Sequence, residues 1–204
     1  MGELNTGLRS ILGDPRIYEA LQALMGGGRR RQDFVDQYVR PRHGARILDI
    51  GCGPARLLKY LPESVEYVGY DTNARYVAWA TRHYSGRGQF IASRFDAAEL
   101  ERHEPFDIAL MVGVLHHLED REAMDLFALL RQALRPGGRV ITVDNVFESG
   151  QNPIARKLIE WDRGQNVRTS EGYKVLAEPF FDVVQGTVIH RSFVPYTYWI
   201  MECH

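Results

Sequence analysis

The sequence has few cysteines, almost no net charge and no long apolar run. Its 204 residues include two cysteines, Cys52 and Cys203, too few for a disulfide framework or an unaided zinc site. The formal net charge at pH 7 is −1, so the whole chain has no electrostatic attraction for nucleic acid. No apolar run approaches the roughly 18 residues that cross a bilayer, and the first residues, MGELNTGLRS, lack a signal-peptide core. We therefore predict a cytoplasmic monomer or homodimer with no nucleic-acid partner and no membrane span.

The composition is that of an ordinary globular domain. Hydrophobic residues make up 45% of the sequence and charged residues 25%, and the length suits one sizeable domain. Apolar spacing predicts two helices, 15–25 and 31–40, which form an N-terminal helical cap over residues 1–45. The stretch GGGRRR between them predicts a glycine break followed by a solvated helix start.

From residue 46 the chain alternates between short apolar strands and helical segments. Strands are predicted at 46–50, 65–71, 89–93, 106–112 and 139–147, and helices at 54–61, 72–84 and 119–134. Two late strands, FDVVQGTVIH and YTYWIMECH, are separated by about five residues, too few for a parallel crossover, and should pair antiparallel. The predicted fold class is α/β: a doubly wound, Rossmann-like sheet of seven strands, mostly parallel with an antiparallel C-terminal strand, and helices on both faces.

The alternation lapses between the fifth strand and a helix predicted to run from about 170 to 179. Residues 148–169 are polar and partly helical, and they contain a surplus of basic and amide side chains. Arginine binds carboxylate or phosphate through two hydrogen bonds, so the segment predicts a lid over an anionic or hydroxylated acceptor. A solvated helix with ordinary surface charge is the alternative.

The stretch ILDIGCGPAR, residues 47–56, joins the first strand to a helix through two glycines. Glycine lets a ligand approach the main chain, and ligands of open α/β sheets bind at the carboxyl ends of strands. A dinucleotide site would have a third glycine three positions after Gly53, where this chain has Arg56. Asp49 also suits a positively charged ligand better than a pyrophosphate. Both features disfavour a nicotinamide-dependent oxidoreductase.

Four motifs in order resemble those of the class I S-adenosylmethionine-dependent methyltransferases. DIGCGPA resembles the first motif of that family, and Asp71, which closes YVGYD, occupies the place of its ribose-binding acid. VGVLHHLED, residues 112–120, resembles the fourth-strand motif of the small-molecule branch, and LRPGGRVITVD resembles the entry to the fifth strand. The resemblance covers residues 46–147.

The resemblance implies an S-adenosylmethionine site, with S-adenosylhomocysteine as product. Gly51 and Gly53 would line the methionine and ribose, and Asp71 would accept hydrogen bonds from the two ribose hydroxyls. Asp49 would act through its neighbours or a water near the amino group, which the backbone after the fourth strand would receive. The implied cofactor-binding residues are Asp49, Gly51, Gly53, Asp71, Thr72, Phe95, Asp96, Val112 and Gly113.

The segment after the third strand departs from the family pattern. It reads ASRFDAAEL, where the family commonly has Gly-Asp followed by a small residue. Either Asp96 reaches the adenine amino group from a longer turn, or Arg94 and Phe95 replace that contact. Phe95 is also placed to cover the face of the ring.

Methyl transfer from a sulfonium is an in-line displacement, so the enzyme mainly has to orient the acceptor and exclude water. A base is needed only where the acceptor must lose a proton, and His117, just beyond the fourth strand, is the catalytic candidate. Packing of the two adjacent histidines under the cofactor is the alternative. The predicted acceptor-binding residues are Tyr18, His116, Asn145, Arg163 and Arg168.

Asp144 and Asn145, at the end of the fifth strand, resemble part of a metal-assisted site. The further acid that such a site needs after the fourth strand is absent, so we predict no metal. The pair is expected to form hydrogen bonds near the acceptor pocket or to shape the strand end.

The function predicted is O- or N-methylation of a small molecule. Motifs for methylating nucleic-acid bases are absent: there is no Asn-Pro-Pro-Tyr and no Pro-Cys pair. A module that binds the cofactor without turnover remains an alternative, and a nicotinamide-dependent oxidoreductase is a weaker one.

Overall fold

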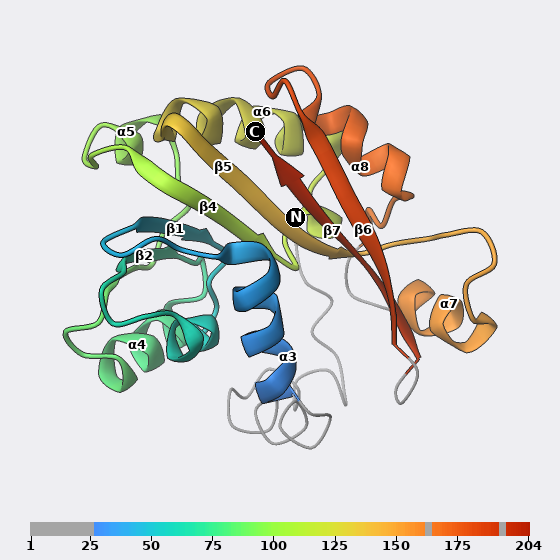
Figure 1. Cartoon of the computed structure of the whole chain (residues 1–204), viewed down its shortest axis with the longest axis horizontal. Coiled ribbons are helices and arrows are strands. Elements are labelled where there is room, and N and C mark those ends of the chain that lie inside the picture. The colour runs from blue at the N-terminus through green and yellow to red at the C-terminus, as the bar shows by residue number, and fades with distance from the viewer. Residues whose placement is uncertain (1–26, 162–164, 192–194) are drawn as a thin grey trace.

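A seven-stranded sheet forms the centre of the protein (Figure 1). The computed structural model describes residues 27–161, 165–191 and 195–204. The strand order is β3-β2-β1-β4-β5-β7-β6, and β7 runs antiparallel to both of its neighbours while all other pairs are parallel. The strands are β1 Arg46–Ile50, β2 Glu66–Tyr70, β3 Gln89–Ile91, β4 Phe106–Val112, β5 Leu134–Asn145, β6 Val184–Arg191 and β7 Tyr196–Cys203. The predicted fold class is therefore confirmed, including the antiparallel C-terminal strand.

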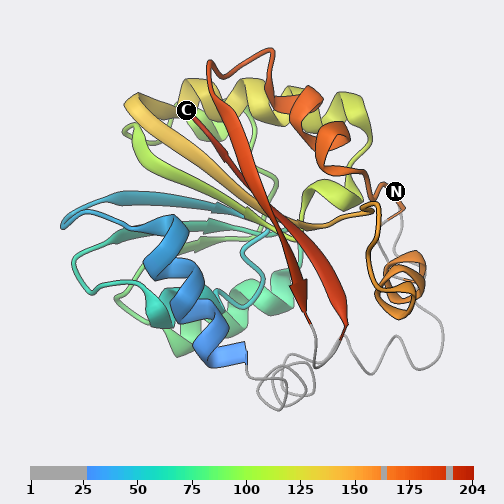
Figure 2. The same ribbon diagram turned by 45° about the vertical axis from the view of Figure 1, so that its right-hand side comes forward.

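Helices cover both faces of this sheet. Figure 2 shows α3 and α4 on one side and α6 and α8 on the other. The first side holds α3 Gly27–Phe34, the π-helical turn η1 Val35–Val39, the 3-10 helix η2 Arg56–Tyr60 and α4 Ala74–His83. The remaining elements are α5 Ala97–Leu100, the 3-10 turn η3 Leu115–His117, α6 Asp120–Ala133, α7 Pro153–Glu160 and α8 Ser170–Ala177.

Alternating side chains of each strand supply two separate cores. On β1, Ile47 packs with Leu58 of η2 on one face, whereas Leu48 packs with Phe127 of α6 on the other. Such alternation follows from the pleat of a strand, which directs successive side chains to opposite faces. Because both faces are buried, the sheet is held rigidly, and the turns at its edge are fixed in position.

Some local predictions need correction. No glycine break follows Gly26 in the described residues: α3 begins at Gly27 and runs through the arginines. A Cβ on Gly28 would lie 3.2 Å from the hydroxyl of Tyr60, so the small residue lets α3 approach η2. The short helix α5 was not predicted, although the carboxylate of Asp96 caps its first turn. The helix predicted at 15–25 lies outside the described residues.

The fifth strand also begins earlier than predicted. It starts at Leu134 instead of residue 139, because Leu134 pairs with Phe106 of β4, and a register shift separates this pair from the next one, Arg139 with Ile108. Such an irregularity accommodates the proline and glycines that would otherwise end the strand.

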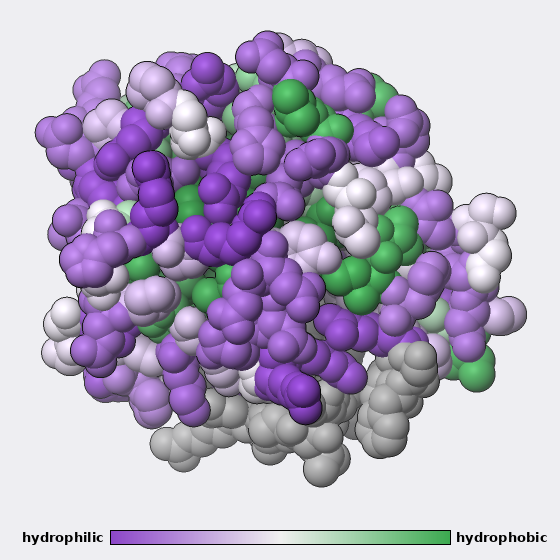
Figure 3. All heavy atoms as spheres, in the orientation of Figure 1, coloured by the Kyte–Doolittle hydropathy of each residue, from purple (hydrophilic) through white to green (hydrophobic). Residues whose placement is uncertain are grey.

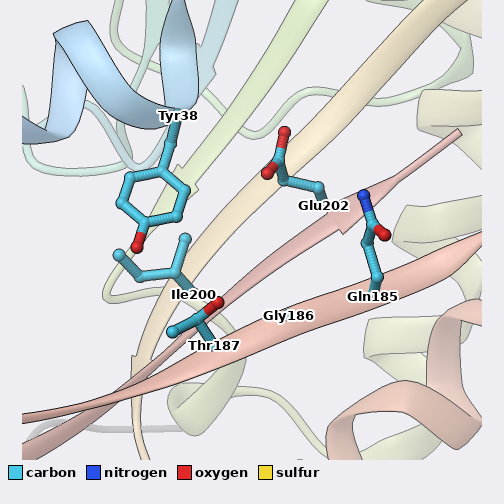
Figure 4. A pocket seen from close by; sticks show the side chains of 6 residues that line it. All are labelled: Tyr38, Gln185, Gly186, Thr187, Ile200 and Glu202. Carbon is cyan, nitrogen blue, oxygen red and sulfur yellow. The ribbon is translucent and has the colours of Figure 1, made fainter.

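The surface offers one polar hollow away from the strand ends. A pocket of about 250 Å³ lies between η1 and the last two strands, lined by Tyr38, Gln185, Gly186, Thr187, Ile200 and Glu202 (Figure 4). It lies on the face of the sheet, where Glu202 pairs with Ile141 in mid-strand. The surrounding surface is mainly hydrophilic with scattered apolar groups (Figure 3). None of the helices in the described ranges combines the length and apolar character needed to cross a membrane.

Candidate active site

The carboxyl ends of three neighbouring parallel strands bring the glycine turn and the predicted ligand-binding residues together. Ile50, the last residue of β1, pairs with Tyr70 of β2 on one side and with Met111 of β4 on the other. The turn that follows β1 is tied to β2 by a hydrogen bond from the backbone N–H of Cys52 to the carbonyl of Tyr70, at 3.0 Å. The same edge holds Asp71, the first residue after β2. This is the edge at which open α/β sheets bind ligands.

The turn itself is built from left-handed backbone conformations. Gly51 has φ +67° and Gly53 has φ +54°, values that L side chains rarely adopt. A Cβ on Gly51 would lie 2.7 Å from Cγ2 of Val114, whereas a Cβ on Gly53 would meet no atom within 4 Å among the described residues other than its two chain neighbours. Gly51 is therefore needed for packing against the β4 loop, and Gly53 faces open space in which a ligand can lie against the main chain.

Asp71 is held in a fixed orientation beside Gly53. Its Oδ2 accepts a hydrogen bond from the backbone N–H of Gly53 at 2.8 Å, and its Oδ1 accepts one from the backbone N–H of Asn73 at 2.7 Å. The N-cap of α4 is Asn73, so the carboxylate of Asp71 belongs to the turn rather than to the helix cap. Thr72 is exposed at the same edge. A carboxylate fixed in this way suits a ligand that presents two adjacent hydroxyls.

Asp49 lies beneath the turn and is only 4% exposed. The hydroxyl of Tyr67 donates a hydrogen bond to its Oδ2 at 2.6 Å. Burial raises the pKa of Asp49 to about 7, the hydrogen bond from Tyr67 lowers it in part, and the nearby charge of Asp71 raises it further. The same burial, together with both carboxylates, raises the pKa of the Cys52 thiol. Asp49 is therefore a buried acid that titrates near neutrality beside the ligand-binding turn.

The end of β4 is open to solvent. Val112 is 44% exposed although the six residues of β4 before it are buried. Gly113 has φ +73°, and its backbone N–H donates to the carbonyl of Val143 on β5 at 2.7 Å. An exposed valine beside a left-handed glycine leaves apolar surface at the position expected for the ligand amino group and its neighbouring carbons.

The residues expected at the adenine lie differently. Phe95 is 6% exposed and packs edge-on against Tyr70, with ring centroids 5.1 Å apart, so little of its ring faces the site. Oδ1 of Asp96 accepts from the backbone N–H groups of Ala98 and Glu99, at 2.9 and 3.0 Å. The Phe95 ring thus belongs mainly to the core and the Asp96 carboxylate caps α5, and the contacts of these two residues with the adenine stay a prediction.

A buried acid and histidine meet where β4 and β5 end. Nδ1 of His116 lies 2.7 Å from Oδ1 of Asp144, and the backbone N–H of His116 donates to the same oxygen at 3.2 Å. His116 is 5% exposed and Asp144 is 1% exposed. Burial raises the pKa of Asp144, although the hydrogen bonds and charge of His116 lower it in part. The exposed ring of His117 lies beside that of His116, with centroids 4.1 Å apart.

Sequence reasoning did not identify this pair, although it placed Asp144 near the acceptor pocket. The signal was present: β4 and β5 are neighbouring parallel strands, so residues after one and at the end of the other must lie close together. The second carboxylate oxygen of Asp144 is buried without a hydrogen-bond partner in the described part of the chain. An uncompensated buried oxygen of this kind is typical of functional sites.

The predicted acceptor-binding residues divide into three groups. Tyr18 and Arg163 lie outside the described residues. Asn145 is 6% exposed, and its carbonyl accepts a hydrogen bond from the hydroxyl of Tyr173 at 2.9 Å. All three nitrogens of the Arg168 guanidinium group donate hydrogen bonds within the protein, and its contact with an acceptor stays a prediction.

No group of three or more His, Cys, Asp or Glu side chains in the described ranges has the arrangement of a metal site. The site consists of the glycine turn at Gly51 and Gly53, the carboxylates of Asp49 and Asp71, and the histidine loop, which carries His116 and His117.

Comparisons with known proteins relate the chain to methyltransferases. A family profile described as a methyltransferase domain matches residues 48–140. A ubiquinone biosynthesis O-methyltransferase from Rhizobium rhizogenes is 30% identical over 167 residues, which cover 76% of this chain and 66% of the relative. A tRNA U34 carboxymethyltransferase from Pseudoalteromonas translucida is 28% identical over 140 residues, 67% of this chain and 42% of that protein. The chain therefore spans just under two thirds, or less, of the length of these relatives.

A solved structure shares the fold over almost the whole chain. A methyltransferase in calicheamicin biosynthesis, in its S-adenosylhomocysteine-bound form, superposes with a TM-score of 0.64 at 19% identity. The match covers 98% of this chain and 61% of that one.

Proposed function

Because this chain belongs to the class I S-adenosylmethionine-dependent methyltransferase family, we propose that it transfers a methyl group from S-adenosylmethionine to a small-molecule acceptor. The observation that carries the cofactor assignment is the carboxylate of Asp71, fixed by the backbone N–H groups of Gly53 and Asn73. It gives the ribose hydroxyls an oriented acceptor at the edge where such folds bind ligands.

The residues at this edge fit the cofactor. Gly53 presents main chain to a space that no protein atom fills within 4 Å of its missing Cβ. Asp49 and Asp71 provide negative charge for a ligand that carries a positively charged sulfur and an ammonium group. When bound, S-adenosylmethionine supplies an electrophilic methyl group. The protein has to hold the acceptor in line with that group and remove a proton where the acceptor has one to lose.

We assign proton removal to the histidine loop. His117 is exposed at the carboxyl edge, and its ring lies against the buried ring of His116, which Asp144 holds. In the proposed reaction the acceptor oxygen or nitrogen forms the new bond to the methyl carbon. The carbon–sulfur bond breaks with its electron pair staying on sulfur, and the acceptor proton passes to His117. The buried pair beneath keeps that loop in place.

The acceptor pocket is proposed to lie between the N-terminal cap, residues 1–45, and the insertion at 148–169. The C-terminal end of the insertion supports this location, since the backbone N–H of Asn166 donates to the carbonyl of His116 at 3.0 Å. The insertion therefore ends beside the loop that carries the proposed base. By its name, the Rhizobium relative methylates an oxygen in ubiquinone biosynthesis, which supports a hydroxylated acceptor. In the insertion itself, Arg156 and Lys157 on α7 add positive charge, and each is paired with Glu160.

The test is methyl transfer from S-adenosylmethionine labelled on the methyl group. The purified protein is offered three sets of acceptors: hydroxylated aromatic acids, amines and bulk tRNA, because one relative acts on tRNA by its name. Label on a hydroxylated small molecule is the expected result. Label on tRNA would overturn the small-molecule assignment. Micromolar S-adenosylhomocysteine binding without turnover on any set would favour a cofactor-binding module.

A further inference from the structure

Arg168 forms a dense set of contacts next to the proposed active site. Its Nη1 donates to the carbonyls of Leu115 and Asn166, at 3.0 and 2.8 Å, and its Nη2 donates to the carbonyl of Leu118 at 2.8 Å. Nε and Nη2 both donate to Oδ1 of Asp120, at 2.9 and 2.7 Å. The side chain is 12% exposed. One largely buried guanidinium group thus binds the carbonyl of Asn166, two residues away, together with two carbonyls and a carboxylate from a segment about 50 residues away.

Two of those carbonyls delimit the histidine turn. Leu115 is the first residue of η3 and Leu118 is its C-cap, so His116 and His117 lie between the two points that Arg168 binds. A positive charge near the end of a helical turn donates to its last carbonyls, here to that of Leu118 and, beside the backbone N–H of Leu118, to that of Leu115. Asp120 is the first residue of α6, so the same guanidinium group also fixes the start of the next helix.

The backbone of Arg168 is attached to the other half of the buried pair. Arg168 forms an isolated parallel bridge with Val146, and its carbonyl accepts a hydrogen bond from the backbone N–H of Phe147 at 3.0 Å. Val146 follows the end of β5, two residues after Asp144. The main chain of Arg168 is thus fixed to the end of β5, whereas its side chain is fixed to the loop after β4.

Tyr173 supports this arrangement from below. The guanidinium carbon of Arg168 lies 5.6 Å from the centre of the Tyr173 ring, and the Tyr173 hydroxyl donates to the carbonyl of Asn145 at 2.9 Å. Tyr173 is fully buried in α8. The aromatic face therefore supports the cation while its hydroxyl fixes the end of β5.

We propose that Arg168 is a positioning residue that sets the geometry between the histidine loop and Asp144, and that it couples this geometry to the docking of residues 165–168 at the end of the insertion. The proposal rests on the proposed function, because it assigns the insertion a role in the same reaction. Arg168 joins the two chain segments that carry the buried pair, and it does so from the irregular C-terminal end of the insertion. If the end of the insertion moves, the carbonyls of Leu115 and Leu118 lose their hydrogen bonds from Arg168, and only the carbonyl of Leu115 keeps another donor among the described residues, the backbone N–H of Leu118.

The geometry requires arginine rather than any cation. A guanidinium group offers five N–H donors in a rigid plane, whereas the ammonium group of lysine offers three donors at a single point. Lysine therefore cannot reproduce the five hydrogen bonds that Arg168 donates to Leu115, Leu118, Asn166 and Asp120. Loss of positioning around a reacting group by about 1 Å costs on the order of 100-fold in rate.

The experiment compares Arg168→Lys with Arg131→Lys. Arg131 is exposed in the last turn of α6 and has no part in the proposed site, so it is a matched surface control. We expect Arg168→Lys to bind S-adenosylhomocysteine within about twofold of the wild type, while kcat falls by on the order of 100-fold. The control should keep wild-type kcat. Added guanidinium ion should restore part of the activity of Arg168→Ala, which a merely structural defect would not allow.

Failure of the proposal and failure of the proposed function are distinguishable. If the wild type neither binds S-adenosylhomocysteine nor turns over, the proposed function is wrong. If the wild type is active and Arg168→Lys retains its kcat, only the positioning role is overturned. Should Arg168→Lys not fold, Asp120→Ala serves instead, because it removes two of the five hydrogen bonds and leaves the guanidinium group free to turn. A kcat unchanged in that variant would equally overturn the proposal.

Discussion

Oδ1 of Asp144 accepts from the backbone N–H of His116 and lies 2.7 Å from Nδ1 of the same residue. One oxygen therefore fixes both the main chain and the ring of a residue that belongs to another strand's loop. Because Nδ1 faces the carboxylate, the opposite ring nitrogen, Nε2, is the one directed away from it. Because β4 and β5 are neighbours, this carboxylate at the end of β5 fixes the orientation of the histidine loop that follows β4.

The charge of Asp144 is expected to matter for turnover and not for cofactor binding. Asp144→Asn keeps the volume and an acceptor oxygen for both donors of His116, but it removes the negative charge. We expect kcat to fall by about tenfold or more, a part of the 10²–10⁴-fold that general base catalysis contributes, with unchanged S-adenosylhomocysteine affinity by calorimetry. Asp125→Asn, exposed on α6, is the control. An unchanged kcat would show that the pair is only structural.

Asp71 is expected to determine cofactor affinity. Removal of its carboxylate in Asp71→Ala deletes the acceptor for the ribose hydroxyls and also leaves the N–H groups of Gly53 and Asn73 without their partner. Loss of hydrogen bonds to a charged group costs about 1.5–3 kcal/mol each, so S-adenosylhomocysteine should bind about 100-fold more weakly. Asp71→Asn should lose less, since it keeps one acceptor oxygen. Calorimetric titration of the three proteins measures this, and equal affinity in all of them would remove Asp71 from the site.

Stability should fall as pH rises from about 4 to about 7 because of Asp49. Burial raises the pKa of this acid from 3.8 to about 7 in the folded state, so the folded protein binds one proton more than the unfolded chain in that range. The stabilisation from the neutral acid is complete at low pH and is lost as pH approaches 7. One pKa unit corresponds to about 1.4 kcal/mol, so the contribution is on the order of a few kcal/mol.

Denaturant unfolding of the wild type and Asp49→Asn at pH 5 and pH 8 isolates this contribution. The free energy of unfolding of the variant should exceed that of the wild type at pH 8 by more than at pH 5, because the variant never carries a buried charge. A difference that does not depend on pH would mean that Asp49 has an ordinary pKa.

The same titration should affect the cofactor. Binding of the cationic S-adenosylmethionine favours the ionised form of Asp49, so its affinity should increase as pH rises through about 7, with release of a proton. Calorimetry at pH 7 in buffers of different ionisation enthalpy counts that proton. In Asp49→Asn the released proton and the pH dependence should both disappear, and their persistence would assign them to another group.

The sequence predicted the sheet and the cofactor edge better than the acceptor side, for a physical reason. Strands and glycine turns leave local sequence patterns. The apolar run before Gly51 and the acid at the end of the second strand can both be recognised from the residues next to them. The His116–Asp144 pair and the contacts of Arg168 join segments 28 and about 50 residues apart, and no local pattern encodes such distances. The sequence predicts Arg168 as a cation that binds the acceptor. It cannot reveal the contacts of Arg168 within the protein, because most of them are with backbone carbonyls, which every residue type has.

Gly53 is expected to be needed for ligand binding beyond its backbone conformation, and Gly137 provides a matched control. Both have positive φ, +54° and +76°, and in both an added Cβ would meet no protein atom within 4 Å. Alanine at either position should therefore cost a similar amount, about 1–2 kcal/mol of the free energy of unfolding, from the left-handed conformation alone. Gly137 lies in the irregular first part of β5, away from the carboxyl edge.

The two variants should differ only in ligand affinity. In Gly53→Ala the methyl group occupies the space proposed for the cofactor, so S-adenosylhomocysteine should bind at least about tenfold more weakly, a loss of about 1.4 kcal/mol. Gly137→Ala should bind as the wild type does. Thermal unfolding and calorimetry on both variants separate strain from obstruction. If Gly53→Ala loses stability but keeps full affinity, the cofactor does not lie against this turn, because a side chain there would have to displace it.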